Sequence, residues 1–336
     1  MNDAPLSRRA LLARTGAFGV TVSIPFVAPR AFAQAADWPS RGPIKVIVPG
    51  PPGGAMDNLL RIIQPALQQS LNQTVVLDFK PGANSIIGID AVAKAPADGY
   101  TLCIAPSSAI AINPIILPKM PYDAQKDLVP VAQMGAAGIL LVANPSTGLK
   151  NLQDLVNYAK ANPGKLAYAS WGNGSTGHLV MEGIKSSYGL FMPHIPYKTT
   201  AQEVTDLLAN NIGVGFTDIA SPVPHIRAGK LVALGATGSS RGPALPNLPT
   251  LSEQGFKFDL DGWFGVFAPA ATPPAIVARL NQEIGHALAN EENRQKFAQQ
   301  NMSLPAYKNA AQFGGQVKTD IEMWKALGKK ANLKMD

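Results

Sequence analysis

The sequence has little cysteine, few charged residues and no long apolar run. One cysteine, Cys103, occurs among 336 residues, so an internal disulfide is excluded. Its apolar neighbours predict a small residue of a buried strand rather than a nucleophile. No run of 18 apolar residues is present, which predicts no membrane span. Charged residues make up 15% and hydrophobic residues 46%, a composition typical of a globular protein rather than a disordered one.

Histidines and basic residues are scattered, which argues against two kinds of partner. None of the histidines lies at metal-ligand spacing from another or from the cysteine, so no metal and no other cofactor is predicted. The net charge of +7 comes from dispersed Lys and Arg with no basic run and no interleaved aromatics. Binding to nucleic acid is therefore not predicted, whereas an anionic ligand suits the mild positive charge. The four histidines are His178, His194, His225 and His286.

The first 33 residues have the pattern of an export signal. Arg8 and Arg9 precede a modestly apolar stretch at 15–28, and the small residues Ala31 and Ala33 form a cleavage pattern. The paired arginines and the weak hydrophobicity favour the twin-arginine route, and an ordinary Sec signal is the alternative. We expect the mature chain to begin near residue 34 and to work outside the cytoplasm.

Apolar runs of strand length alternate with amphipathic runs of helix length, which predicts an α/β fold. The sequence then ends in a purely helical region. Strands are expected at 44–48, 75–79, 100–105, 139–143, 166–169, 212–217 and 231–236. Helices are expected at 57–70, 86–94, 151–161, 176–188, 200–210, 221–228, 273–289, 291–300 and 309–330.

Two glycine-containing breaks, at 134–139 and 258–265, look like crossings between two lobes. If the chain leaves one lobe at the first break and returns at the second, domain 1 holds residues 37–136 plus 259–336. Domain 2 then holds residues 137–258. Two α/β lobes joined by two crossings form a cleft that closes around a ligand.

The loop that follows the first predicted strand, PGPPGGAMD at 49–57, is rich in glycine. It lacks the lysine of a phosphate-binding Walker loop and the GxGxxG spacing of a dinucleotide loop. Asp57 is a good N-cap for the helix that follows. Gly53 and Gly54 allow close backbone approach, and free amides with the helix dipole suit a carboxylate. The alternative is a simple tight turn.

A second loop of the same kind is YASWGNGSTGHL at 168–179. Ser175 is the expected N-cap of its helix, and the two loops would hold the two ends of one ligand. Ser175 and His178 also resemble part of a hydrolase nucleophile elbow. The first glycine of that elbow is missing, however, and the histidine is too near in sequence. His178 is expected near the cleft wall, in either a structural or a ligand-contacting role.

Further polar or small residues follow other strands. The loop at 80–88 and the pair at 107–108 come after predicted strands, and Asp218 follows the strand at 212–217. Asp218 would bind a ligand ammonium or a water, or would cap a helix at 221. The predicted ligand-binding residues are Pro52, Gly53, Gly54, Ala55, Met56, Asp57, Ala83, Asn84, Ser85, Ser107, Ser108, Ser170, Trp171, Gly172, Asn173, Gly174, Ser175, His178 and Asp218; no catalytic residue is predicted.

Eight stretches in order, spanning about residues 38–336, together resemble one family. They are PIKVIVPGPPGGAMD, KPGANSIIG, VAKAPADGYTL, NPIILPKMPYD, YASWGNGSTGHL, HIPYK, GKLVALGAT and LPTLSEQG. The sequence resembles the Bug-type (TctC-like) substrate-binding proteins of tripartite tricarboxylate transporters. The resemblance implies a two-lobed periplasmic binding protein of the type II-like, Venus-flytrap kind, with two mixed sheets flanked by helices and a ligand cleft between the lobes.

The resemblance also implies a function. The protein would capture a small di-, tri- or aromatic carboxylate in the periplasm, largely through backbone amides, and deliver it to the membrane permease subunits. It would act as a monomer and not as an enzyme. The alternatives are a receptor that presents its ligand to a sensor kinase and a secreted serine hydrolase.

The sequence departs from the family pattern inside the binding loops, at Gly50, Pro52, Asn84, Ser85 and Trp171. The identity of the ligand therefore does not carry over. Trp171 would stack on an aromatic ligand, or it would only cover the surface of its lobe.

Overall fold

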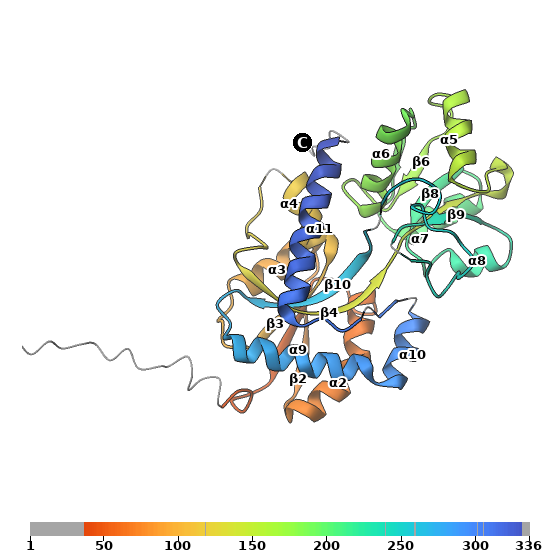
Figure 1. The fold of residues 1–336 in the computed structure, drawn as a ribbon. Coiled ribbons are helices and arrows are strands. Elements are labelled where there is room, and N and C mark those ends of the chain that lie inside the picture. Colours follow the sequence, from red (N-terminus) through yellow and green to blue (C-terminus); the bar gives the residue numbers. More distant parts are fainter. Residues whose placement is uncertain are drawn as a thin grey trace, which may run out of the picture.

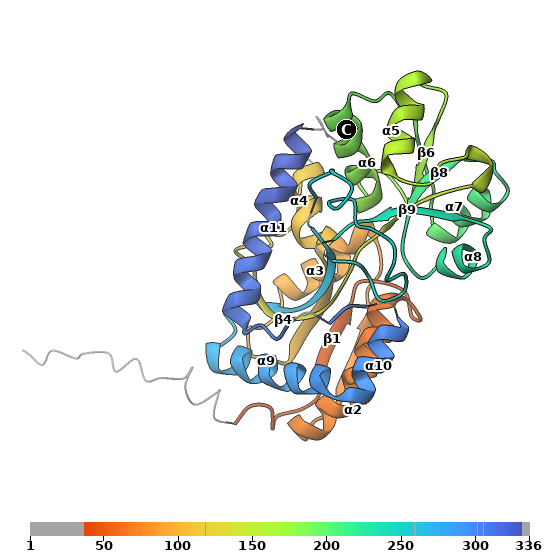
Figure 2. The same cartoon turned by 45° about the vertical axis from the view of Figure 1, so that its right-hand side comes forward.

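A computed structural model describes residues 37–330 except 118, 239, 259, 301 and 305. The predicted export signal at 1–33 lies outside the described residues. Within them, none of the helices is both long enough and apolar enough to cross a membrane. Figures 1 and 2 show two α/β lobes, with the final long helix running along one side of the molecule.

Each lobe is built around one five-stranded mixed sheet. We call the lobe with the strand order β2-β1-β3-β10-β4 lobe 1, and the lobe with the order β7-β6-β8-β5-β9 lobe 2. In lobe 1, β1 pairs in parallel with β2 and β3, whereas β10 runs antiparallel to β3 and β4. In lobe 2, β6 pairs in parallel with β7 and β8, whereas β5 runs antiparallel to β8 and β9. The predicted α/β class with two mixed sheets is therefore confirmed.

The strands are β1 (Ile44–Val48), β2 (Val75–Phe79), β3 (Thr101–Pro106), β4 (Leu128–Ala137), β5 (Leu140–Ala143), β6 (Tyr168–Ser170), β7 (His194–Pro196), β8 (Val214–Thr217), β9 (Val232–Ala236) and β10 (Gly262–Pro269). The α-helices are α2 (Ala55–Leu71), α3 (Ile86–Ala93), α4 (Asn113–Ile116), α5 (Leu152–Ala161), α6 (Thr176–Tyr188), α7 (Thr200–Leu208), α8 (Val223–Arg227), α9 (Pro274–Ala289), α10 (Glu291–Gln299) and α11 (Ala310–Lys330). Two 3-10 helices are η1 (Ala83–Ser85) and η3 (Pro145–Thr147), and η2 (Ser108–Ile112) is a short π-helix.

The sequence patterns predicted neither β4, β7 nor β10. Strand β4 contains Pro130 and shows no alternation because both of its faces are largely buried. Strand β10 falls partly in the stretch that was expected to be a crossing, because its glycine and aromatic residues look like a break. The chain leaves the lobe 1 sheet after Ala137 and returns to it at Gly262. The predicted domain limits lie close to these points and stay a prediction.

Two helices show why the chain folds locally as it does. Helix α6 begins where Ser175 accepts the His178 N–H, as the sequence predicted for an N-cap. Helix α2 begins at Ala55, with Gly54 as N-cap, so the prediction that Asp57 is the N-cap was wrong. Asp57 instead lies in the first turn, where its Oδ2 accepts the Gly53 N–H at 2.7 Å. Helix α2 continues through Pro65 without a break.

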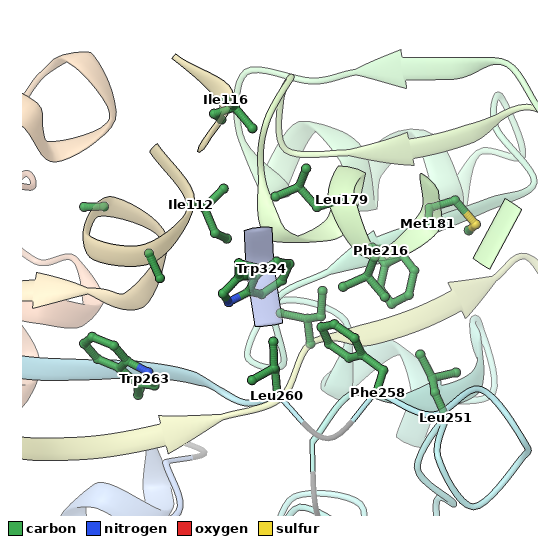
Figure 3. Close-up of a cluster of buried hydrophobic side chains, with 14 of the residues drawn as sticks. Ile112, Ile116, Leu179, Met181, Phe216, Leu251, Phe258, Leu260, Trp263 and Trp324 are labelled. Carbon is green, nitrogen blue, oxygen red and sulfur yellow. The ribbon is translucent and has the colours of Figure 1, made fainter. Parts of the chain in front are cut away.

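One hydrophobic cluster joins the two lobes (Figure 3). Trp324, on α11 of lobe 1, is 3% exposed and lies among residues of both lobes. Its ring meets the Phe258 ring edge-on, with centroids 5.5 Å apart. Nearby, α6 packs so closely on α11 that a β-carbon at Gly183 would lie 2.7 Å from Leu327. The last helix therefore anchors lobe 2 to lobe 1.

Replacing Trp324 with alanine should lower the free energy of unfolding by about 3–5 kcal/mol, because it leaves a large cavity in the joint core. Urea denaturation measures this change. Met323→Ala is the matched control, since the neighbouring Met323 side chain is 41% exposed and should change stability by less than about 0.5 kcal/mol. Equal losses in the two variants would contradict the anchoring role of Trp324.

Candidate functional site

A cavity of about 470 Å³ lies between the lobes and is lined by residues of both. Lobe 1 contributes residues of α2, the end of β3 and β10, and lobe 2 contributes the starts of α6 and α7 and the end of β8. The lining residues are Ala55, Asn58, Leu59, Pro106, Ser107, Ser108, Ala137, Gly138, Ile139, Trp171, Thr176, Thr200, Asp218, Ile219, Ala220, Gly262, Trp263, Phe264, Gln300 and Met302.

Three helices begin at this cavity. Ala55, Thr176 and Thr200 are the first residues of α2, α6 and α7, and all three line it. The first amides of a helix have no acceptor within the helix, and the helix dipole places partial positive charge there. Of the described residues that line the cavity, none is Lys, Arg or His. Helix amino-termini are therefore the main source of positive potential at this cavity.

The lining combines apolar walls with hydrogen-bonding groups. Trp171, Trp263 and Phe264 supply aromatic surface, and Trp171 is held against the start of α6, where a β-carbon at Gly177 would lie 2.8 Å from its ring. Asn58, Ser107, Ser108, Thr176, Thr200 and Gln300 supply neutral polar groups. Such a mixture suits a small organic ligand with one or two polar ends.

Five of the predicted ligand-binding residues line the cavity: Ala55, Ser107, Ser108, Trp171 and Asp218. The others are not part of this lining; they lie in the glycine loops, in the loop at 82–85 or at the ends of the adjoining helices and strand, and their role as ligand contacts stays a prediction. They are Pro52, Gly53, Gly54, Met56, Asp57, Ala83, Asn84, Ser85, Ser170, Gly172, Asn173, Gly174, Ser175 and His178.

In the first glycine loop, the protein itself uses the amides that were predicted for the ligand. Gly53 N–H donates to Asp57, and Gly54 N–H donates to the Pro51 carbonyl at 3.2 Å. Asp57 is 3% exposed and pairs with Arg61 at 2.7 Å. The amides of Ala55, Met56 and Asp57, which begin the helix, are the ones left by this arrangement.

The loop at 82–85 is hydrogen-bonded to the start of the first glycine loop. Ala83, Asn84 and Ser85 all have left-handed φ angles, at 46°, 50° and 73°, which is unusual for residues other than glycine. Ser85 Oγ donates to the Pro49 carbonyl, and Asn113 Nδ2 donates to the Asn84 carbonyl. These bonds keep the strained loop in place against the start of the glycine loop.

A partly buried polar network holds the second glycine loop. The His178 and His194 rings stack with centroids 4.1 Å apart and an interplanar angle of 8°. His194 Nε2 lies 2.7 Å from Ser170 Oγ at the start of the loop, and Gly174 N–H donates to His178 Nδ1 at its end. Burial lowers the pKa of both rings, and that of His194 falls to about 4.

This network gives no support to the hydrolase alternative. Ser175 Oγ accepts the His178 backbone N–H and donates to Ser170 Oγ, so its contacts belong to the helix cap. Ser170, which lies beside a histidine ring, is fully buried and cannot meet a substrate. Among the described residues, no group of three or more His, Cys, Asp or Glu side chains could hold a metal ion.

Sequence reasoning missed Thr200 and the buried residue Glu203. Helix α7 carries Thr200 at the cavity, and Glu203, one turn later, is 0% exposed. Burial raises the pKa of Glu203 to about 9, with a smaller contribution from the nearby Asp218 charge. A signal was available, because Glu203 lies four residues before the buried Leu207 and therefore on the apolar face of the helix.

The comparisons agree with a two-lobed solute receptor. Residues 59–333 match the family model described as tripartite tricarboxylate transporter family receptor. Protein BugT of Bordetella pertussis is 37% identical over 97% of this chain and 98% of its own. The chain belongs to the TctC family of tripartite tricarboxylate transporter receptors, a family of periplasmic binding proteins.

Solved structures of similar proteins include two with small carboxylates. An R. palustris protein solved with adipate is 31% identical, with a TM-score of 0.77 over 89% of this chain and 100% of its own. MatC from Rhodopseudomonas palustris, solved with bound malate, is 26% identical, with a TM-score of 0.73 over 85% of this chain and 99% of its own. Both similarities support the two-lobed fold.

The free energy of unfolding should fall as the pH rises, because Glu203 ionises more readily in the unfolded chain than in the folded protein. The carboxyl is protonated in the folded state up to a pH of about 9, whereas in the unfolded chain it ionises near its ordinary pKa of 4.5. Between these values the unfolded state binds fewer protons, so the free energy of unfolding falls by up to about 1.4 kcal/mol per pH unit. Below about pH 4.5 this loss is absent.

Urea denaturation of the wild type and Glu203→Gln at pH 5, 7 and 9 tests this. The free energy of unfolding of Glu203→Gln, relative to that of the wild type, should increase with pH, because glutamine has the same shape as glutamate and does not ionise. Glu291→Gln, on an exposed side chain, should show no such trend. A constant difference between Glu203→Gln and wild type would contradict a neutral buried carboxyl.

Proposed function

We propose that the protein is a periplasmic receptor that captures a small carboxylate in the cavity between its lobes. Backbone amides, and not cationic side chains, would hold the carboxylate group of the ligand. The observation that carries this proposal is the meeting of three helix amino-termini, from both lobes, at a cavity whose described lining contains no basic residue.

The binding of adipate and malate by similar proteins supports the same class of ligand. Aromatic carboxylates fit as well, because Trp171 and Phe264 line the cavity. The resemblance to tripartite transporter receptors supports delivery of this ligand to the permease subunits of such a transporter. Export through the signal at 1–33 and action as a monomer complete the proposal.

A carboxylate that binds the cavity should raise the melting temperature by several degrees at saturating concentration, because it stabilises only the folded state. Adipate, malate and benzoate are the first probes, with glucose and a neutral amide as comparison ligands. A shift with glucose and none with any carboxylate would contradict an anion site.

A bulky side chain that fills the cavity should abolish the rise in melting temperature caused by the ligand, without unfolding the protein. Ala55→Trp places a large ring at the start of α2, where the native side chain is exposed and lines the cavity. We expect the affinity measured by calorimetry to fall at least tenfold. Ala161→Trp, at an exposed position at the end of α5, is the matched control and should bind as the wild type does.

A further inference from the structure

Asp218 is the one charged side chain among the described residues that line the cavity. Its Oδ1 accepts the Ser221 N–H at 2.7 Å, and its Oδ2 accepts the Ser221 hydroxyl at 3.0 Å. An ionised carboxylate has about four acceptor positions. Ser221 therefore fixes the orientation of the group and leaves it able to accept further hydrogen bonds.

A second acid, Glu203, lies next to this group in the interior of lobe 2. Glu203 follows Thr200 by one turn of α7, and its Oε1 lies over Gly215, where a β-carbon would be only 2.6 Å away. Gly215 belongs to β8, the strand that leads directly to Asp218. Neither carboxyl oxygen of Glu203 has a hydrogen-bond partner among the described residues.

Two further acidic groups, Tyr197 and Asp206, lie near Glu203. Tyr197 and Asp206 bond to each other at 2.8 Å, and Asn211 holds the second oxygen of Asp206. The charge of Asp218 adds to burial in keeping the pKa of Glu203 high. Among the described residues, Asp218 is thus the acidic group that the cavity lining presents on this side, and none of those lining residues is basic.

A ligand carboxylate placed against Asp218 would meet a like charge in a partly desolvated cleft, which disfavours binding. A hydroxyl or an ammonium group at the same place would instead donate a hydrogen bond to an ionised acceptor, one of the stronger kinds of hydrogen bond. The helix amino-termini still favour a carboxylate elsewhere in the cavity.

We propose that the ligand carries one carboxylate and, at its other end, a hydrogen-bond donor that Asp218 accepts. This rests on the proposed function and narrows it, since the second polar group of the ligand is then a hydroxyl or an ammonium and not a second carboxylate.

Three matched series of probes test the inference by calorimetry at pH 7. The six-carbon series is hexanoate, 6-hydroxyhexanoate, 6-aminohexanoate and adipate, and the four-carbon series is butanoate, 4-hydroxybutanoate, 4-aminobutanoate and succinate. The aromatic series is benzoate, 4-hydroxybenzoate and terephthalate. In the series that fits the cavity, a donor-bearing member should bind roughly tenfold or more tightly than both the unsubstituted acid and the dicarboxylate.

Asp218→Asn should reduce the preference for the donor-bearing probe over the dicarboxylate at least tenfold, chiefly because the variant binds the dicarboxylate more tightly. The amide oxygen of asparagine can still accept the Ser221 N–H, and circular dichroism checks the fold. Asp206→Asn is the matched control. It makes the same aspartate-to-asparagine change, but Asp206 lies on α7 and outside the cavity lining, so the preference among the probes should stay unchanged.

The pH dependence separates the roles of the two acids. Raising the pH from 7 to 9.5 should weaken the binding of the dicarboxylate in the wild type, as Glu203 ionises beside Asp218. At pH 7, Glu203→Gln should bind each probe within twofold of the wild-type affinity. Between pH 7 and pH 9.5, its affinity for the dicarboxylate should not fall as that of the wild type does.

The two proposals fail in different ways. Dicarboxylates that bind as tightly as the donor-bearing probes, with no effect of Asp218→Asn on the ranking, would overturn this inference and leave a carboxylate receptor standing. No binding of any member of the three series would overturn the carboxylate assignment, and this inference with it.

Discussion

The amino-terminal ends of α2, α6 and α7 meet at one cavity, and recognition there depends on where those helices begin. Apart from substitution by proline, a mutation leaves the backbone amide in place, so the sequence controls these amides chiefly through the residues that fix each helix start. Gly54 starts α2, Ser175 starts α6 and Thr199 starts α7. Because no lysine or arginine lines the cavity among the described residues, an error of one residue in a helix start would move the positive potential itself.

The loops behind the cavity are consequently more constrained than the cavity walls. His178 and His194 contact the two ends of the second glycine loop, and the His178 ring must be neutral because its Nδ1 accepts a backbone N–H. On the opposite lobe, Asp57 accepts the Gly53 N–H. Ser85, one of the three residues with left-handed φ angles at 83–85, donates to the Pro49 carbonyl at the start of the first glycine loop. Several residues predicted as ligand contacts thus make hydrogen bonds that hold the two loops, and their contact with a ligand stays a prediction.

Local signals in the sequence predicted most elements because they depend on neighbouring residues. The helix at 176–188 was predicted with its observed limits, since Ser175 and the apolar spacing specify it locally. Strand β10 was not predicted, because its pairing with β3 and β4 joins segments over a hundred residues apart. The cavity is hidden in the same way, because Gln300 and Met302 reach it from the C-terminal region. Glu203 and Asp218 are closer in the sequence, but only the folded chain shows that they are neighbours.

The crossing of α6 over α11 has a mechanical consequence. Gly183 lets the two helices touch at Leu327, and Trp324 fixes the neighbouring side chains of both lobes in one core (Figures 1 and 3). Pulling the lobes straight apart would expose that core to water, whereas turning one lobe about the glycine contact would keep it buried. A relative motion of the lobes that keeps α6 against α11 would therefore cost less free energy than one that separates the two helices.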